Sequence, residues 1–296
     1  MSNLVFYIVD VFAEEKYAGN QLAVVRDTRG LSTSEMQAIA REMHFSETSF
    51  ILSEKKRQGG YDVRIFTPEE ELPFAGHPTL GTAYVISQEV VKKQIGKIIL
   101  NLKVGQIPVT ITHADGKPDV LWMRQKHPTF GTTYEVERIA DALNLEVADI
   151  DPAFPIQEVS TGISAIIVPL RTLSAVKRAR TDRDKYFELV TNTEAKSILV
   201  FCPETYHRQN HLNVRVFVDF YGIPEDPATG SANGCLAAYL VKHKYFAQNK
   251  INIRVEQGYE IKRTSLLLLK AAQSKGGRIN VDVGGKVVPV AKGELL

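Results

Sequence analysis

The stretch Val63-Arg64-Ile65-Phe66 returns later in the chain as Val214-Arg215-Val216-Phe217. In both places a strand-like run leads through a carboxylate-containing loop to a glycine, Gly76 or Gly230, and then into an apolar helix-like run. Recurrence of such a unit at a separation of roughly 150 residues is the signature of an internal repeat. Two unrelated strand-to-helix turns are the alternative, but duplication is the simpler explanation and predicts two similar halves.

The hydrophobic pattern around these units alternates between strand and helix periodicity. A capping box, Ser32 with Glu35 three residues later, marks the start of the first helix. Gly76-His77-Pro78 marks the start of another, with Pro78 near its first position. The pattern predicts strands at 4–12, 22–25, 47–52, 61–67, 97–102, 106–112, 163–170, 197–202 and 213–219. It predicts helices from 32, over 78–88, near 136–146, near 182–190 and after Gly230.

Length and composition exclude several functional classes. The chain has 296 residues, a net charge of +2, 44% hydrophobic residues and 24% charged residues, which is typical of a globular protein. No basic stripe interleaved with aromatic residues is present, so we expect no nucleic-acid partner. The two cysteines, Cys202 and Cys235, lack the spacing of a zinc site or a redox pair. We therefore expect no metal site and no redox-active cysteine pair.

The N-terminal sequence and the apolar runs bear on location. Met1 to Tyr7 enters a strand-like run directly, without a basic region, a long apolar stretch or a small-residue cleavage site. The apolar runs are shorter than the ~18 residues that a membrane span requires. Together with the low cysteine content, this predicts a cytoplasmic protein without a membrane partner.

The two repeated helix starts suggest a binding function. The first turn of a helix has unsatisfied N–H groups and a partial positive charge, so it can bind an anion without lysine or arginine. Gly76 and Gly230 would let a carboxylate approach the backbone closely. The structural alternative is that both are ordinary helix starts. A dinucleotide site is disfavoured, because neither glycine-containing turn has the spacing of the G-x-G-x-x-G motif.

Four groups of residues resemble the phenazine-biosynthesis PhzF-like family when they are taken together. They are Val9-Asp10-Val11-Phe12 with Gly19-Asn20; Ser46-Glu47-Thr48; Phe66-Thr67-Pro68 with Glu71-Leu72-Pro73 and Ala75-Gly76-His77-Pro78-Thr79; and Glu225-Asp226-Pro227-Ala228-Thr229-Gly230-Ser231. Thr161-Gly162 before a strand also looks like part of the family pattern. The likeness runs in consistent order from about residue 5 to the C-terminus.

The resemblance implies the diaminopimelate-epimerase-like fold. This is an α/β (α+β) architecture of two similar halves, each a curved β-sheet around a central helix, with the ligand in the cleft between them. We expect a first domain of residues 1–115 plus 280–296 and a second of residues 120–275, with a last strand near 280–296 that returns to the first domain. The helices after Gly76 and Gly230 would be the two central ones.

The resemblance also assigns roles to particular residues. It implies a cofactor-independent isomerase that moves a proton within a small, unsaturated, carboxylated metabolite, with Glu47 as the acid/base. His77 and Asp226 would complete the catalytic group, and the substrate would be bound by Gly19, Asn20, Gly76, Gly230 and Ser231. We expect the protein to act as a homodimer. A lone glutamate at a strand start is usually a solvated residue. The assignment of Glu47 as the acid/base therefore rests on the family resemblance.

Two other functions remain open. Racemases and epimerases of this fold use a cysteine base at each of two helix starts, and here those places hold Ala75 and the Ala228-Thr229 region. Cys235 falls one turn inside the second helix, where we expect it to be a buried, small, apolar residue. A member that binds a ligand or a protein without turnover is the third possibility. Met43-His44-Phe45 departs from the small residues common in the family at this place, which leaves the substrate open.

Overall fold

The computed structural model describes residues 4–296, so the first three residues of the predicted first domain lie outside the described part. The chain forms two compact units. The first runs to Met123 and includes Gly284–Leu296, and the second comprises Arg124–Val283. The predicted boundaries fell at residues 115–120 and 275–280, a few residues earlier in each case.

The first unit is built from strands and two main helices. Its elements are β1 (Leu4–Val11), β2 (Asn20–Val25), α1 (Thr33–Met43), β3 (Thr48–Ile51), β4 (Tyr61–Phe66), β5 (Glu71–Leu72), α2 (Gly76–Val85), the π-helical turn η1 (Ile86–Val91), β6 (Lys97–Leu102), β7 (Gly105–Ala114), β8 (Lys117–Arg124) and β18 (Val287–Leu295). The strand pairs β1–β2 and β3–β4 are antiparallel, whereas β2–β3 and β4–β6 are parallel.

Local chemistry explains where the first two helices begin. Glu35 N–H donates to Ser32 Oγ over 3.2 Å and Ser32 N–H donates to Glu35 Oε2 over 2.7 Å, which confirms the predicted capping box. α2 begins at Gly76, so Pro78 is its third residue and not its first. The proline is tolerated because first-turn N–H groups have no partner inside the helix.

The second unit repeats the arrangement with additional helices. Its elements are β9 (Thr129–Thr133), α3 (Val136–Ala142), η2 (Val147–Asp149), β10 (Gln157–Ser160), β11 (Ser164–Pro169), α4 (Leu173–Arg178), α5 (Arg183–Val190), β12 (Ile198–Cys202), β13 (Leu212–Phe217), η3 (Asp219–Tyr221), β14 (Glu225–Asp226), α6 (Gly230–Lys242), β15 (Lys250–Gln257), β16 (Ser265–Gln273) and β17 (Ile279–Gly285). The pairs β10–β11 and β12–β13 are antiparallel, and β11–β12 and β13–β15 are parallel.

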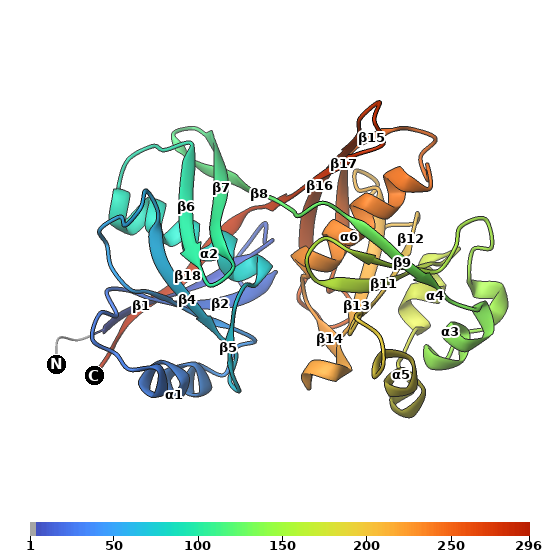
Figure 1. Ribbon diagram of the computed structural model, residues 1–296, viewed down its shortest axis with the longest axis horizontal. Coiled ribbons are helices and arrows are strands. Elements are labelled where there is room, and N and C mark those ends of the chain that lie inside the picture. Colours follow the sequence, from blue (N-terminus) through green and yellow to red (C-terminus); the bar gives the residue numbers. More distant parts are fainter. Residues whose placement is uncertain (1–3) are drawn as a thin grey trace. The chain divides into compact units, whose positions relative to one another are not determined.

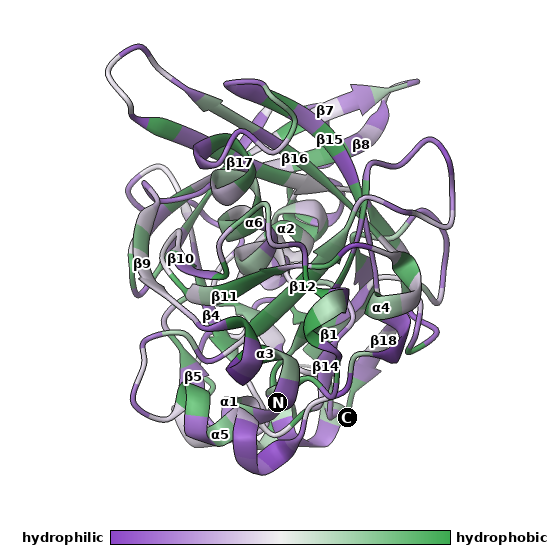
Figure 2. Ribbon diagram, turned by 90° about the vertical axis from the view of Figure 1, so that its right-hand side faces the viewer, coloured by the Kyte–Doolittle hydropathy of each residue, from purple (hydrophilic) through white to green (hydrophobic). Residues whose placement is uncertain are grey.

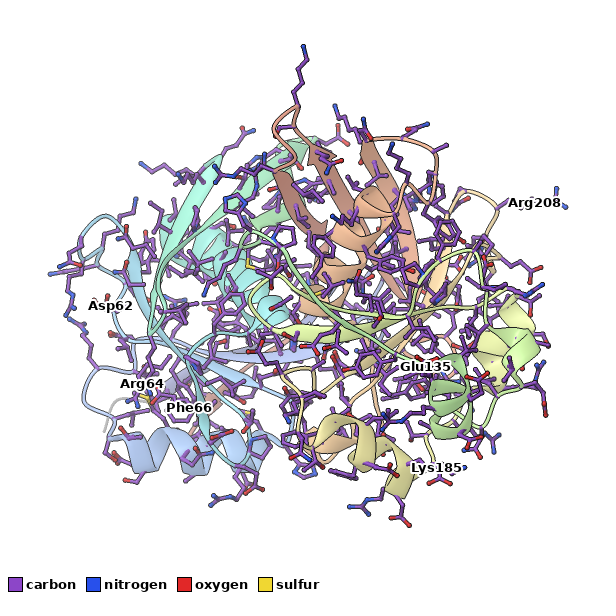
Figure 3. All side chains as sticks on the ribbon, turned by 45° about the vertical axis from the view of Figure 1, so that its right-hand side comes forward. Asp62, Arg64, Phe66, Glu135, Lys185 and Arg208 are labelled. Atoms are coloured by element: carbon purple, nitrogen blue, oxygen red, sulfur yellow. The ribbon has the colours of Figure 1, made fainter. Side chains whose placement is uncertain are left out.

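The duplication seen in the sequence reappears in the strand register. Phe66 pairs with Glu71 in the first unit, and Phe217 pairs with Glu225 in the second. The arginine two residues before each phenylalanine forms a two-pronged ion pair with that glutamate and lies over that ring, at 5.0 Å in the first unit and 4.8 Å in the second. Figure 3 shows the first of these arginines, Arg64, next to Phe66 on β4. The predicted fold of two similar halves is therefore correct.

Each unit surrounds one apolar helix with its strands. α2 contacts β1, β2, β3, β6 and β7, and α6 contacts β10, β11, β15 and β16 (Figure 1). Both helices are buried along most of their length. Many of the strands around them are also hydrophobic, as the green colour in Figure 2 shows. Gly81 allows α2 to approach its sheet, because a Cβ there would lie 2.5 Å from Leu22 Cδ2. These are the predicted central helices.

Some elements differ from the sequence prediction. The predicted helix over 78–88 changes from α-helical to π-helical winding at Ile86. The prediction missed the helix α4 and the strands β5, β8, β9, β10, β14, β15 and β16. The single strand expected near 280–296 is two strands, β17 and β18. Among residues 4–296, no helix is long and apolar enough to cross a membrane.

Candidate active site

Three of the predicted site residues lie at one edge of the first unit's sheet. β2 and β3 run parallel, with Ala23 opposite Thr48, so both strands begin at the same edge. Asn20 is the first residue of β2, and Glu47 immediately precedes β3. Gly19 turns the chain into β2 with φ +65°, and a Cβ there would lie 2.3 Å from the Val11 carbonyl oxygen. The backbone therefore requires glycine at position 19.

Glu47 and His77 approach each other at this edge. His77 Nε2 lies 3.4 Å from Glu47 Oε2, and the two side chains are 7% and 16% exposed. The same Nε2 lies 3.3 Å from the Gln21 carbonyl oxygen. Because a carbonyl oxygen can only accept, this contact places the imidazole proton on Nε2.

His77 is neutral in this environment. Burial lowers its pKa from the usual 6.5 to about 3, although the hydrogen bond to Gln21 acts in the opposite direction. The contact with Glu47 is therefore between a carboxyl group and a neutral N–H, not an ion pair. At 3.4 Å it is longer than a well-formed hydrogen bond, which is common for catalytic contacts before substrate binds.

The start of α2 has no side-chain cap. Ala75 occupies the N-cap, has no side-chain cap to offer, and is followed by a first turn without acidic residues. α1, α4 and α5 instead have side-chain caps from Ser32, Thr172 and Asp182. Gly76 at the first helical position thus begins a helix whose own first turn contains no acidic residue.

In the second unit, Asp226 is held within a half-buried polar network. Thr229 Oγ1 donates to Asp226 Oδ2 over 2.5 Å, and Gln257 Nε2 donates to the Asp226 carbonyl oxygen over 2.8 Å. Gln257 also donates to Thr229 Oγ1 over 3.0 Å and accepts from Thr229 N–H over 3.2 Å. Asn233 Nδ2 donates to Gln257 Oε1 over 2.8 Å.

The same network leaves the start of α6 without a side-chain cap. Thr229 is the N-cap residue, and threonine normally caps by accepting from the first turn. Here it forms no such bond, since its hydroxyl is directed to Asp226. Gly230 and Ser231 are the first two helical residues, at the positive end of the helix dipole.

The structure thus gathers the predicted residues into two groups. Glu47, His77 and Gly76 share the first unit with the Gly19-Asn20 turn, and Asp226, Gly230 and Ser231 share one loop of the second unit. Their joint action on one substrate stays a prediction. Sequence reasoning missed Gln257, because no strand was predicted over residues 250–257 and its partner Asp226 is 31 positions away.

The cysteines do not provide thiol bases. Cys235 is fully buried within α6, as predicted, and burial raises its pKa to about 11. Burial likewise raises the pKa of Cys202 to about 12. The N-cap positions of the two central helices hold Ala75 and Thr229. The arrangement of a two-thiol racemase is therefore not present.

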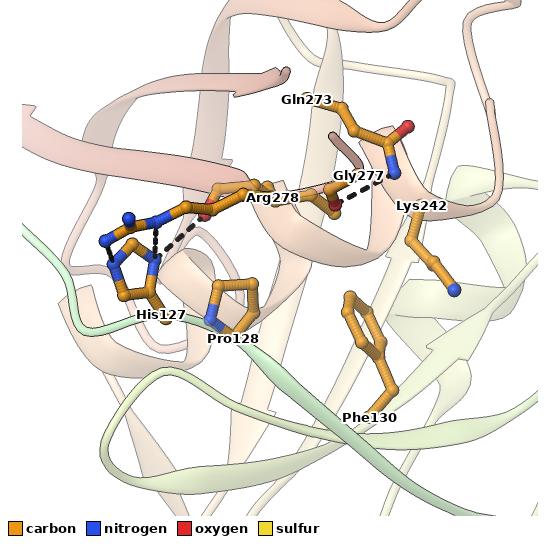
Figure 4. Close-up of a pocket in the computed structure, with 8 residues that line it drawn as sticks. His127, Pro128, Phe130, Lys242, Gln273, Gly277 and Arg278 are labelled. Atoms are coloured by element: carbon orange, nitrogen blue, oxygen red, sulfur yellow. Dashed lines mark hydrogen bonds between the residues drawn. The ribbon is translucent and has the colours of Figure 1, made fainter. Parts of the chain in front are cut away.

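A small pocket in the second unit lies apart from the predicted residues. Its volume is about 270 Å³, and its lining includes His127, Lys242 and Arg278 (Figure 4). None of Asp226, Gly230 and Ser231 lines it. Within residues 4–296, no cluster of three or more histidine, cysteine or acidic side chains has the arrangement of a metal site.

Comparison with known proteins identifies the family. Residues 9–293 match the family of phenazine biosynthesis-like (PhzC–PhzF) proteins. The chain belongs to the PhzF-like family. It is 34% identical over 289 residues to trans-2,3-dihydro-3-hydroxyanthranilate isomerase of Pseudomonas aeruginosa, covering 97% of this chain and 98% of that protein. It is 33% identical to an uncharacterized isomerase of Mesorhizobium japonicum, with 98% of each chain covered.

Solved structures agree with this assignment. The PhzF-family protein of Bacillus anthracis superposes with a TM-score of 0.90 at 30% identity, with 100% of both chains covered. A hydroxyproline epimerase of Agrobacterium vitis shares the fold with a TM-score of 0.67 at 9% identity, covering 100% of this chain and 91% of that one. The protein is thus an isomerase of the PhzF-like family with the diaminopimelate-epimerase-like fold.

Proposed function

We propose that this PhzF-like isomerase moves a proton within a small, unsaturated, carboxylated metabolite without a cofactor, and that Glu47 is the acid/base. The observation that carries the proposal is the 3.4 Å approach of Glu47 Oε2 to Nε2 of the neutral, buried His77. A carboxyl group in a largely desolvated site, next to a neutral donor, is a suitable general base.

The proposed reaction has two proton transfers. The Glu47 carboxylate removes a proton from a carbon of the substrate, and the electron pair of that C–H bond enters the conjugated system. The Glu47 carboxylic acid then returns the proton to a different carbon, so that a double bond has shifted and no atom is gained or lost. Backbone N–H groups at the start of α2 would stabilise the anionic intermediate.

The remaining residues take binding and orienting roles in this proposal. His77, through Nε2–H, orients the Glu47 carboxyl group, and Asp226 and Ser231 orient polar groups of the substrate. Backbone groups close to the substrate are supplied by Gly19, Asn20, Gly76 and Gly230. The 34% identity to trans-2,3-dihydro-3-hydroxyanthranilate isomerase supports a cyclic amino acid or hydroxy acid of that type as the substrate class. A cytoplasmic homodimer is the proposed working form.

Glu47→Gln tests the proposal most directly, because it keeps the shape of the side chain and removes the base. The assay follows deuterium uptake from solvent by NMR, first with trans-2,3-dihydro-3-hydroxyanthranilate and then with other unsaturated carboxylates. Turnover of whichever compound the parent converts should fall by at least about 10²–10⁴-fold, the usual contribution of general acid/base catalysis.

Glu42→Gln is the matched control, since Glu42 is an exposed residue of α1 in the same unit. It makes the same change in charge, and turnover should stay within about twofold, as surface substitutions usually have little effect. Equal activity of Glu47→Gln and the parent would remove Glu47 from the mechanism.

A further inference from the structure

The matching registers of the two units allow their positions to be compared one by one. Leu72 and Asp226 hold the same place, because Leu72 pairs with Ile65 and Asp226 with Val216, each one step from the phenylalanine–glutamate pair. Each lies four residues before the glycine that begins the central helix. By the same count, Ala75 in the first unit corresponds to Thr229 in the second.

A second strand pair extends the comparison. Asp62 pairs with Asn101 between β4 and β6, and Asn213 pairs with Glu256 between β13 and β15. In both units the asparagine side chain donates to the carboxylate of its partner, over 2.8 Å in the first and 3.2 Å in the second. The next residue is Leu102 on β6 and Gln257 on β15. Gln257 therefore corresponds to Leu102.

The two units differ sharply at these three places. The first has Leu72, Ala75 and Leu102, whereas the second has the polar set Asp226, Thr229 and Gln257. The fold forms the same strand, loop and central helix with an apolar set, so the polar set is not a requirement of the architecture. Gln257 is fully buried and Asp226 and Thr229 are half-buried. Removing polar groups from water is costly unless they are hydrogen-bonded, so the presence of this network in one unit alone points to a purpose beyond folding.

The hydrogen bonds of Gln257 have a fixed direction. Its side-chain oxygen accepts from Thr229 N–H and Asn233 Nδ2, and its amide nitrogen donates to the Asp226 carbonyl oxygen and to Thr229 Oγ1. All four hydrogen-bonding positions of the amide are used, and the residue is fully buried. Because Thr229 Oγ1 accepts from Gln257, its hydroxyl proton is directed to Asp226 Oδ2.

We infer that Thr229 and Gln257 are positioning residues that orient the Asp226 carboxylate for the isomerisation, an inference that rests on the function proposed above. Gln257 hydrogen-bonds to backbone and side-chain groups of the loop that carries Asp226. The hydroxyl proton of Thr229, held in place by Gln257, then orients the Asp226 carboxylate. The first unit instead carries Glu47 and His77, where the second has Ser197 and Ser231 at the matching places. The duplicated halves have thus diverged into a proton-transferring unit and an orienting unit.

The sharpest test is a double-mutant cycle on turnover with Thr229→Val and Asp226→Asn. Valine has nearly the shape of threonine and removes only the hydroxyl. Loss of a hydrogen bond to a charged group corresponds to a reduction of kcat/KM by roughly ten- to a hundredfold. Because Thr229 acts through Asp226, the double variant should be no slower than Asp226→Asn alone. Additive losses, or full activity of Thr229→Val, would overturn the inference.

Two further variants separate positioning from a general structural role. Thr229→Ser keeps the hydroxyl and should restore kcat/KM to within about threefold of the parent. Thr172→Val makes the same substitution at the N-cap of α4, where Thr172 Oγ1 accepts from Ala175 N–H. It removes a stabilising cap but should leave turnover unchanged. If Thr172→Val slows turnover as much as Thr229→Val, loss of stability alone explains the result.

Gln257→Leu places in the second unit the residue type found at the corresponding position of the first. Its effect on the order of the Asp226 loop can be measured without an activity assay. Amide hydrogen exchange of residues 226–233 should become faster by about tenfold or more, with exchange in β12 unchanged. Unchanged exchange in this loop would show that Gln257 does not order it. Glu47→Gln, assayed in parallel, reports on the proposed function by itself, so a failure of that proposal is distinguishable from a failure of this one.

Discussion

His77 Nε2 lies between two oxygen atoms, 3.3 Å from the Gln21 carbonyl and 3.4 Å from Glu47 Oε2. The ring is buried, and its pKa is lowered to about 3. The N–H of a neutral imidazole therefore bonds to the Gln21 carbonyl and also lies close to the Glu47 carboxyl group. This places a hydrogen-bond donor, and no positive charge, beside the proposed base.

The neutral state of His77 makes stability depend on pH in a defined direction. Since the pKa is about 3 in the folded protein and about 6.5 when unfolded, the unfolded chain binds more protons between these values. The contribution of His77 to stability is thus fully present above pH 6.5 and is lost as the pH falls toward 3. The slope should reach about 1.4 kcal/mol per pH unit.

Urea unfolding of the parent and of His77→Asn at several pH values measures this effect. The difference in unfolding free energy between the two proteins should shrink as the pH is lowered from 6.5 to 4.5. Only the parent loses stability through this group, because its histidine takes up a proton when the chain unfolds. A difference that stays constant over this range would contradict the neutral, buried assignment. His77→Asn should also reduce turnover, since the Glu47 carboxyl group loses its orienting donor.

Replacing Gly19 by alanine should destabilise the first unit by roughly 2–4 kcal/mol. The strained positive φ costs about 1–2 kcal/mol, and the new Cβ would also lie 2.3 Å from the Val11 carbonyl oxygen. Gly116→Ala is the control, because Gly116 has a similar φ of +75° and nothing within 4 Å of the added carbon. If both variants lose the same stability in urea unfolding, the contact with Val11 is unimportant.

The two repeated arginine–glutamate pairs should differ in their effect on stability. Arg215 and Glu225 are 9% and 6% exposed, and Arg215 Nη1 also donates to the carbonyl oxygens of Val176 and Ala179. Arg215→Met leaves a buried carboxylate without its partner, which typically costs 3–5 kcal/mol.

In the first unit, Arg64 is 23% exposed, and Lys103 Nζ lies 2.7 Å from the same glutamate, Glu71. Arg64→Met should therefore cost clearly less than Arg215→Met. Thermal unfolding of the two variants compares them, and an equal or reversed order would show that burial does not control the strength of these pairs.

Cys235 should be dispensable for catalysis. Its thiol is buried with a pKa raised to about 11, so at neutral pH it is not a thiolate. Cys235→Ala should keep turnover within a few-fold of the parent, and iodoacetamide should modify the native protein at this position only slowly. Rapid inactivation by alkylation of Cys235 would revive a thiol-based mechanism.

The sequence by itself determined the duplication, the starts of the central helices and the family. These features are local or repeated: the Ser32–Glu35 capping box, the glycines at 76 and 230, and the recurring Val-Arg-hydrophobic-Phe strand. Short-range patterns of this kind follow from periodicity and capping chemistry, which neighbouring residues decide. The burial of Cys235 was foreseen for the same reason, because it lies on an apolar helix.

Only the tertiary structure decided which polar groups meet. Glu47 and His77 come together because β2 and β3 begin at the same sheet edge and Gln21 accepts from the imidazole. Gln257 reaches the Asp226 loop because β15 pairs with β13, and no pattern within β15 predicts this contact. Hydrogen bonds between distant segments depend on strand order and register. A periodic sequence specifies that a strand exists, whereas packing of the whole unit selects its neighbours.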